Sequence, residues 1–92
     1  MQVYTFDRSE FNWAEEYYDL IQKKMGLPEW FGKNADALWD MLTGFIATPC
    51  EIILSGFNKQ ENAYNRHLIA LINATFQDAA KQYPTKFKIT IK

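Results

Sequence analysis

The chain has 92 residues, nearly half of them apolar or aromatic, and a formal net charge of −1. This length allows one modest core and predicts a single domain over residues 1–92, and the composition excludes a disordered chain. A net charge this small implies no class of partner, so only the distribution of charges along the sequence can indicate one.

The sequence gives no sign of a membrane span or a leader. No apolar run approaches the ~20 residues that cross a bilayer, and the opening MQVYTFD lacks the basic and apolar regions of a signal peptide. The single cysteine, Cys50, cannot form an intramolecular disulfide and is expected to be a buried small apolar residue. We therefore expect a cytoplasmic protein.

The first third of the chain predicts a strand and then a helix. Residues 2–6 favour a strand, and 7–11 form the turn that follows it. A helix is expected to start near Asn12, with Glu15 completing a capping-box pair. Its expected end is marked by Gly26 and Pro28. The apolar stripe of this helix comprises Trp13, Tyr17, Leu20, Ile21 and Met25.

The C-terminal half predicts strand, helix, strand. Residues 51–54 are a near-continuous apolar run, typical of a strand buried on both faces. A loop or an irregular helical turn is expected over 56–64. A helix is expected from about Asn65 to Tyr83, followed by a strand over 86–92 with lysines on one face. Strands separated by helices pair in parallel, so the sequence predicts an α/β fold with a three-stranded parallel sheet packed against helices, in the order β-αα-β-α-β.

The most informative stretch is residues 27–45, LPEWFGKNADALWDMLTGF. An aromatic-rich loop leads to Asn34, whose side chain can cap the first turn of a short helix. Gly44 is expected to end that helix in a left-handed conformation. At helical spacing the helix has two faces. The face expected in the core carries Ala35, Leu38, Met41, Leu42 and Phe45, and the outer face carries Asp36, Trp39, Asp40 and Thr43.

Trp39 therefore lies between two carboxylates on a face expected to be exposed. An exposed aromatic flanked by acids suggests a contact for a basic partner. Two plainer explanations remain open: Asp36 is favoured in a first helical turn by the helix dipole, and Trp39 can fold back into the core.

Other chemistries fit these residues poorly. Asp36 and Asp40 on a solvated face have no means of separating their pKa values, which argues against an acid–base pair and an enzyme. The aromatics alternate with acids rather than with Lys or Arg, the wrong sign for direct RNA binding. One histidine, His67, and one cysteine predict no metal site and no cofactor. A protein-binding surface remains.

The stretch LPEWFGKNADALWDMLTG closely resembles the loop and second helix of the barstar family, the intracellular inhibitors of barnase-type ribonucleases. The resemblance continues without a gap through this stretch and is weaker elsewhere. It implies a barstar-like fold and a stoichiometric inhibitor that occludes a basic ribonuclease active site with an acidic, aromatic helix and loop. In that setting a carboxylate can take the place of an RNA phosphate.

The resemblance also implies roles for residues. Asp40 would mimic the phosphate, Asp36 would be the second acid, and Trp39 would pack beside them. Trp30 and Asn34 would contact the rim or the guanine-side pocket. The remaining partner-binding residues are Thr43, Phe45 and, by an approximate alignment, Asp78.

Three departures from the family pattern indicate a partner that is barnase-like but not barnase. Lys33 stands at a loop position that is often acidic, Asp78 is shorter than the usual Glu, and Trp30 replaces a tyrosine. The free protein is expected to be monomeric. An alternative stays open: an immunity or binding module that uses the same surface on a protein other than a ribonuclease.

Overall fold

The computed structural model describes all residues 1–92 and places three parallel strands beside three helices. In chain order the elements are β1 (Gln2–Asp7), α1 (Ala14–Met25), α2 (Ala35–Gly44), β2 (Cys50–Ser55), α3 (Ala63–Gln82) and β3 (Phe87–Ile91). A one-turn 3-10 helix (Arg8–Glu10) follows β1. The predicted α/β class and the order of its elements are confirmed.

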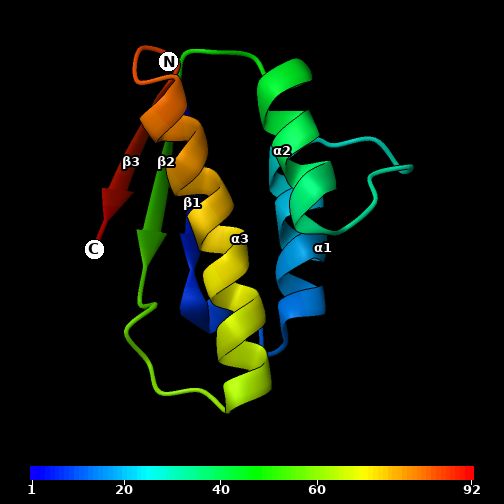
Figure 1. Ribbon diagram of the computed structural model, residues 1–92, viewed down its shortest axis with the longest axis vertical. Coiled ribbons are helices and arrows are strands. Elements are labelled where there is room, and N and C mark those ends of the chain that lie inside the picture. Colours follow the sequence, from blue (N-terminus) through cyan, green and yellow to red (C-terminus); the bar gives the residue numbers. More distant parts are fainter.

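The sheet has the order β1-β2-β3, with every pair parallel. Tyr4 pairs with Ile52, which pairs with Ile89. The three helices lie on one side of this sheet (Figure 1). Long connections through helices return the chain to the same end of the sheet each time, as parallel strands require.

One prediction about β2 is wrong. Its residues alternate between buried and half-buried, so only one face of the central strand is covered by helices. The covered face carries Cys50, Ile52 and Leu54, whereas Glu51 and Ile53 lie on the other face. There the Thr90 hydroxyl donates to the Glu51 carboxylate at 2.6 Å. This polar face lets a parallel sheet remain uncovered on one side.

The core lies between the sheet and the helices. Its largest fully buried side chains come from every layer, so the sheet and all three helices share one interior. Phe6 of β1 stacks on Phe76 of α3, with ring centroids 5.6 Å apart. Free Cys50 is fully buried, as expected, and burial raises the pKa of its thiol. The core includes Phe6, Tyr17, Ile21, Leu38, Leu42, Ile52, Leu54, Ile72 and Phe76.

The start of α1 differs from its prediction. The helix begins at Ala14, and the carboxylate of Glu16, not Glu15, accepts from the backbone amides of Asn12 and Trp13 at 3.0 and 2.8 Å. Trp13 is consequently outside the helical stripe and half exposed. The predicted end is confirmed: Gly26 has φ +64° and its N–H donates to the Gln22 carbonyl.

The start of α3 also differs. Asn62 caps the helix by accepting from the Asn65 amide at 2.9 Å, so α3 begins at Ala63, two residues earlier than predicted. Asn65 is itself buried. It accepts from the Ala14 amide and donates to the Asn12 carbonyl, at 2.9 and 2.8 Å. His67 is exposed, as expected.

The C-terminal strand matches the predicted alternation only in part. Phe87 is buried and Ile89 is half-buried, but Ile91 is 64% exposed because it lies at the end of an edge strand. No helix is both long enough and apolar enough to cross a membrane. No group of three or more His, Cys, Asp or Glu side chains is arranged to hold a metal ion.

Candidate protein-binding site

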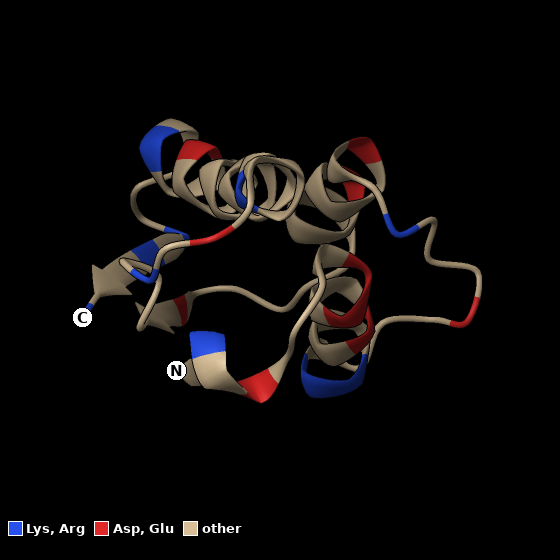
Figure 2. Ribbon diagram, turned by 90° about the horizontal axis from the view of Figure 1, so that it is seen from below, with Lys and Arg blue, Asp and Glu red and all other residues tan.

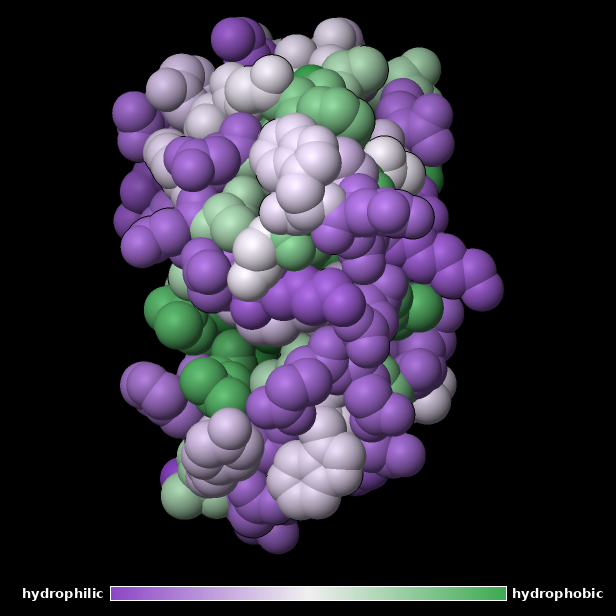
Figure 3. All heavy atoms as spheres, turned by 90° about the vertical axis from the view of Figure 1, so that its right-hand side faces the viewer, coloured by the Kyte–Doolittle hydropathy of each residue, from purple (hydrophilic) through white to green (hydrophobic).

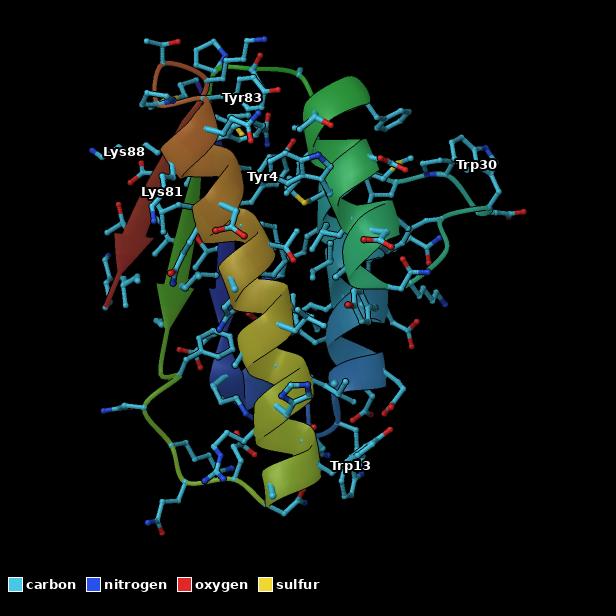
Figure 4. All side chains as sticks on the ribbon, viewed as in Figure 1. Tyr4, Trp13, Trp30, Lys81, Tyr83 and Lys88 are labelled. Carbon is cyan, nitrogen blue, oxygen red and sulfur yellow. The ribbon has the colours of Figure 1, made fainter.

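The loop that joins α1 to α2 is fixed at both ends and presents Trp30 between them. Leu27 and Phe31 are buried, and the Phe31 ring lies against Tyr18 of α1, 6.2 Å between centroids. The Gln22 side chain donates to the Pro28 carbonyl at 2.8 Å. Trp30 is 73% exposed and points outward from the tip of the loop (Figure 4). Phe31 thus anchors the loop in the core, whereas its neighbour Trp30 lies on the surface.

The turn into α2 is tightly built. Asn34 caps the helix, as predicted, by accepting from the Ala37 amide at 2.8 Å. A Cβ at Gly32 would lie 3.2 Å from the Ala37 Cβ, so this position favours glycine. Lys33 takes a left-handed conformation with φ +53°, and its ammonium pairs with Asp19 of α1 at 2.7 Å. The loop and α2 therefore have a defined position relative to α1.

The outer face of α2 carries Asp36, Asp40 and Thr43, all exposed. The Thr43 hydroxyl donates to the Trp39 carbonyl at 2.8 Å, so its hydrogen is already used within the helix. Neither carboxylate takes part in an ion pair or a hydrogen bond within the chain. The inner face, formed by Leu38, Met41 and Leu42, is buried as predicted and fixes the direction in which the acids point.

Trp39 occupies an intermediate position. Its side chain is half-buried, and its ring lies 6.4 Å from the Tyr83 ring at the end of α3, inclined by 37°. Both interpretations of the sequence were therefore partly right: one side of the indole packs on α3 and the other is accessible.

The end of α2 contradicts two expectations. Gly44 is the last helical residue and does not take the left-handed conformation, and the chain leaves the helix at Phe45. Phe45 is 51% exposed and does not belong to the core. The helix extends one residue further than predicted, so Phe45 lies beyond the buried stripe.

Asp78 lies beside Trp39, although 38 residues of sequence separate them. Together with Lys81 and Gln82 they line a shallow hollow of about 480 Å³ between α2 and α3. The sequence did not indicate Lys81 and Gln82 as site residues, because only the packing of α3 on α2 brings them beside Trp39. The signal that was available was their helical spacing of three and four from Asp78.

The structure thus places Asp36, Trp39 and Asp40 on α2 and brings Asp78 of α3 beside Trp39. Asn34 caps the N-terminal end of α2, Thr43 and Phe45 lie at its C-terminal end, and Trp30 projects from the loop beside the helix (Figure 4). Acidic positions lie along α1, α2 and their connecting loop, where basic positions also occur on α1 and on the loop, and further basic positions lie near the C-terminus (Figure 2). Between Ala14 and Gly44 there are six acidic residues and three lysines. This stretch, which includes α2, therefore has a net charge of −3 (six acids against three lysines), compared with −1 for the whole chain.

Comparisons with known proteins show the family of the chain. The family described as Barstar (barnase inhibitor) matches residues 1–92. A Bacillus subtilis (strain 168) protein, named "Putative ribonuclease inhibitor YrdF", is 30% identical over 95 aligned positions that cover the whole of both chains. The chain belongs to the barstar family.

Proposed function

We propose that this protein is a stoichiometric inhibitor of a barnase-like ribonuclease and not itself an enzyme. It acts as one barstar-like domain and a monomer, in the cytoplasm, where it protects its producer from its own ribonuclease. Membership of the barstar family and the similarity to a protein named as a ribonuclease inhibitor support this proposal.

The proposal rests chiefly on two carboxylates of α2 that have no ion-pair or hydrogen-bond partner within the chain. Asp36 and Asp40 are exposed, one helical turn apart, and held on a helix whose other face is buried. A ribonuclease active site must be basic to bind RNA phosphates. Carboxylates that are already oriented can accept charge-assisted hydrogen bonds from its Arg, Lys or His side chains, with Asp40 in the place of a phosphate.

The aromatic residues supply the apolar part of the same interface. Trp30 is exposed on the loop beside α2 (Figure 4), Phe45 is exposed at the C-terminal end of α2, and Trp39 is half-buried on the helix itself. Large aromatic side chains are frequent energetic anchors of protein interfaces. Asn34, Thr43 and Asp78 complete the proposed contact surface.

The test is a titration of this protein into a purified barnase-type ribonuclease while RNA cleavage is followed. We expect inhibition at a one-to-one ratio that weakens with added salt, because steering between opposite charges is screened. Asp40→Asn should raise the inhibition constant about thirtyfold or more, since it removes one partner of a desolvated charge pair.

Glu51→Gln is the matched control. It also replaces one carboxylate by an amide, but on the uncovered face of the sheet, and its amide oxygen can still accept from Thr90. Equal losses in both variants would contradict a specific role of Asp40.

No inhibition by the wild-type protein at micromolar concentration would exclude this enzyme as the target. Capture of a protein from the native host would then decide between a divergent ribonuclease and the alternative, an immunity or binding module for a protein of another class. Both would use the same surface, so loss of capture by Asp40→Asn is expected in either case.

A further inference from the structure

A second concave surface lies between α1 and α3, next to the start of α2. The groove has a volume of about 470 Å³. On the side of the molecule that presents α1 and the loop before α2, the surface is mostly hydrophilic and is interrupted by a hollowed apolar area (Figure 3). The side chains that define the groove are Glu15, Tyr18 and Asp19 of α1, Lys33 of the loop, and Leu68 and Leu71 of α3.

The groove has an apolar floor. Leu71 is 45% exposed, and Tyr18 and Leu68 are only half-buried. Tyr18 and Leu68 also pack against the core, so α1 and α3 together hold the floor of the groove. Apolar surface left accessible in a concave site favours an apolar or long-stemmed occupant.

The rim is acidic. Glu15 is in no ion pair and only accepts from the Tyr64 hydroxyl at 3.4 Å. Asp19 pairs with Lys33, but both groups are about half exposed, and an ion pair in contact with water contributes little. An incoming cation can therefore replace the Lys33 ammonium at Asp19, or bind Glu15 directly.

A long side chain with a cationic head fits both parts of this groove. The aliphatic stem of an arginine would lie on the leucines, its planar guanidinium can stack on Tyr18, and its fork of donors matches a carboxylate. A purely apolar side chain would leave the acidic rim without a partner, and an acidic one would be repelled. An arginine side chain can contact the leucines of the floor, the Tyr18 ring and the acidic rim at the same time.

The groove is continuous with the proposed inhibitory face. Its lining reaches Lys33 and Asn34, the last two residues before α2. A protein that covers Asp36 and Asp40 would therefore extend over the groove. We propose that the groove between α1 and α3 accepts an arginine side chain that the same ribonuclease carries outside its active site. This inference rests on the proposed function and adds a second contact to it.

Leu71→Lys tests the groove without touching α2. The substitution places a cation on the apolar floor at an exposed, helix-compatible position, so the fold is expected to persist. Ala70→Lys is the matched control, because it adds the same charge on the same helix at a position that lines a different hollow. We expect Leu71→Lys to raise the inhibition constant for the ribonuclease about tenfold, and Ala70→Lys to leave it within a factor of two.

Equal inhibition by the two lysine variants would overturn the inference while leaving the effect of Asp40→Asn, and hence the proposed function, intact. If the wild-type protein inhibits no ribonuclease, titration with N-acetyl-arginine amide followed by amide NMR decides instead. Shifts at Leu68 and Leu71 that are absent in Leu71→Lys would support the groove. Their absence in the wild type up to tens of millimolar would overturn it.

Discussion

Trp39 and Trp30 differ in what their removal should affect. Trp39 packs on Tyr83 with part of its indole, whereas Trp30 is 73% exposed at the loop tip. We expect Trp39→Ala to lower the free energy of unfolding by ~2 kcal/mol, about half the loss for a fully buried tryptophan. Trp30→Ala should change it by less than ~0.5 kcal/mol.

Urea unfolding of both variants, with inhibition assays alongside, measures this difference. Both substitutions should weaken binding under the proposed function. A loss in Trp39→Ala as large as that of a core truncation would mean that Trp39 serves the core alone.

Asp7 should make stability depend on acid pH. The Ser55 hydroxyl donates to its carboxylate at 2.6 Å, and with two hydrogen bonds from Ser9 this lowers the pKa of Asp7 to about 2, from 3.8. Because the folded pKa is the lower one, the stabilisation is fully present above the unfolded value and is lost as pH falls from about 4 to about 2.

Asp7→Asn should therefore flatten the acid limb of the stability profile, since the amide does not titrate in this range. Urea midpoints from about pH 6 to about pH 2.5 test this. The pKa of Glu61 is also lowered, chiefly by its hydrogen bond from Arg8, so part of the acid dependence should remain in the variant. An unchanged profile would mean that Asp7 contributes nothing to it.

At the scale of elements, the two helix-terminal glycines should respond oppositely to alanine. Gly26 ends α1 with φ +64°, where a Cβ is strained, whereas Gly44 is helical and a Cβ there meets nothing within 4 Å. Gly26→Ala should lower the free energy of unfolding by ~1 kcal/mol. Gly44→Ala should raise it by up to ~1 kcal/mol, because alanine favours helix.

Thermal or urea unfolding of the two variants provides the comparison, and each serves as the control for the other. Destabilisation by Gly44→Ala would support the left-handed helix end that the sequence predicted, against the structure.

At the scale of the whole molecule, a largely buried polar cluster joins the segment that follows β1 to the start of α3. Arg8, which is 5% exposed, forms an ion pair with Glu61, and its guanidinium also donates to the Phe11 and Asn12 carbonyls. Asn65 donates to Asn12 as well. The cluster fixes the start of α3 against the corner between β1 and α1.

Glu61→Ala should lower the free energy of unfolding by ~3 kcal/mol, because it leaves the buried Arg8 without its anion. The double variant Arg8→Met/Glu61→Leu should recover much of this loss, since it removes both charges. Urea unfolding of the single and double variants forms the test, and an equal or greater loss in the double variant would argue against a charge-pair origin.

The sequence alone was enough for most of the fold. The presence of a strand at 87–91, the Asn34 cap and the Gly26 stop could be predicted because each depends on residues close together in the chain. The predictions from sequence were less accurate at helix boundaries. Asn62 caps α3, which begins two residues before the predicted start, and Glu16 rather than Glu15 caps α1. Neighbouring residues of equal capping ability cannot be separated by pattern alone.

The candidate site divides in the same way. The buried face of α2 and the outward direction of Asp36 and Asp40 follow from helical spacing. Tertiary structure decided that Trp39 is half-buried on Tyr83, that Asp78 lies beside it with Lys81, and that a groove forms between α1 and α3. These features join residues about 40 or more positions apart, and they arise only when whole helices pack, because the burial of a side chain depends on which other element covers it.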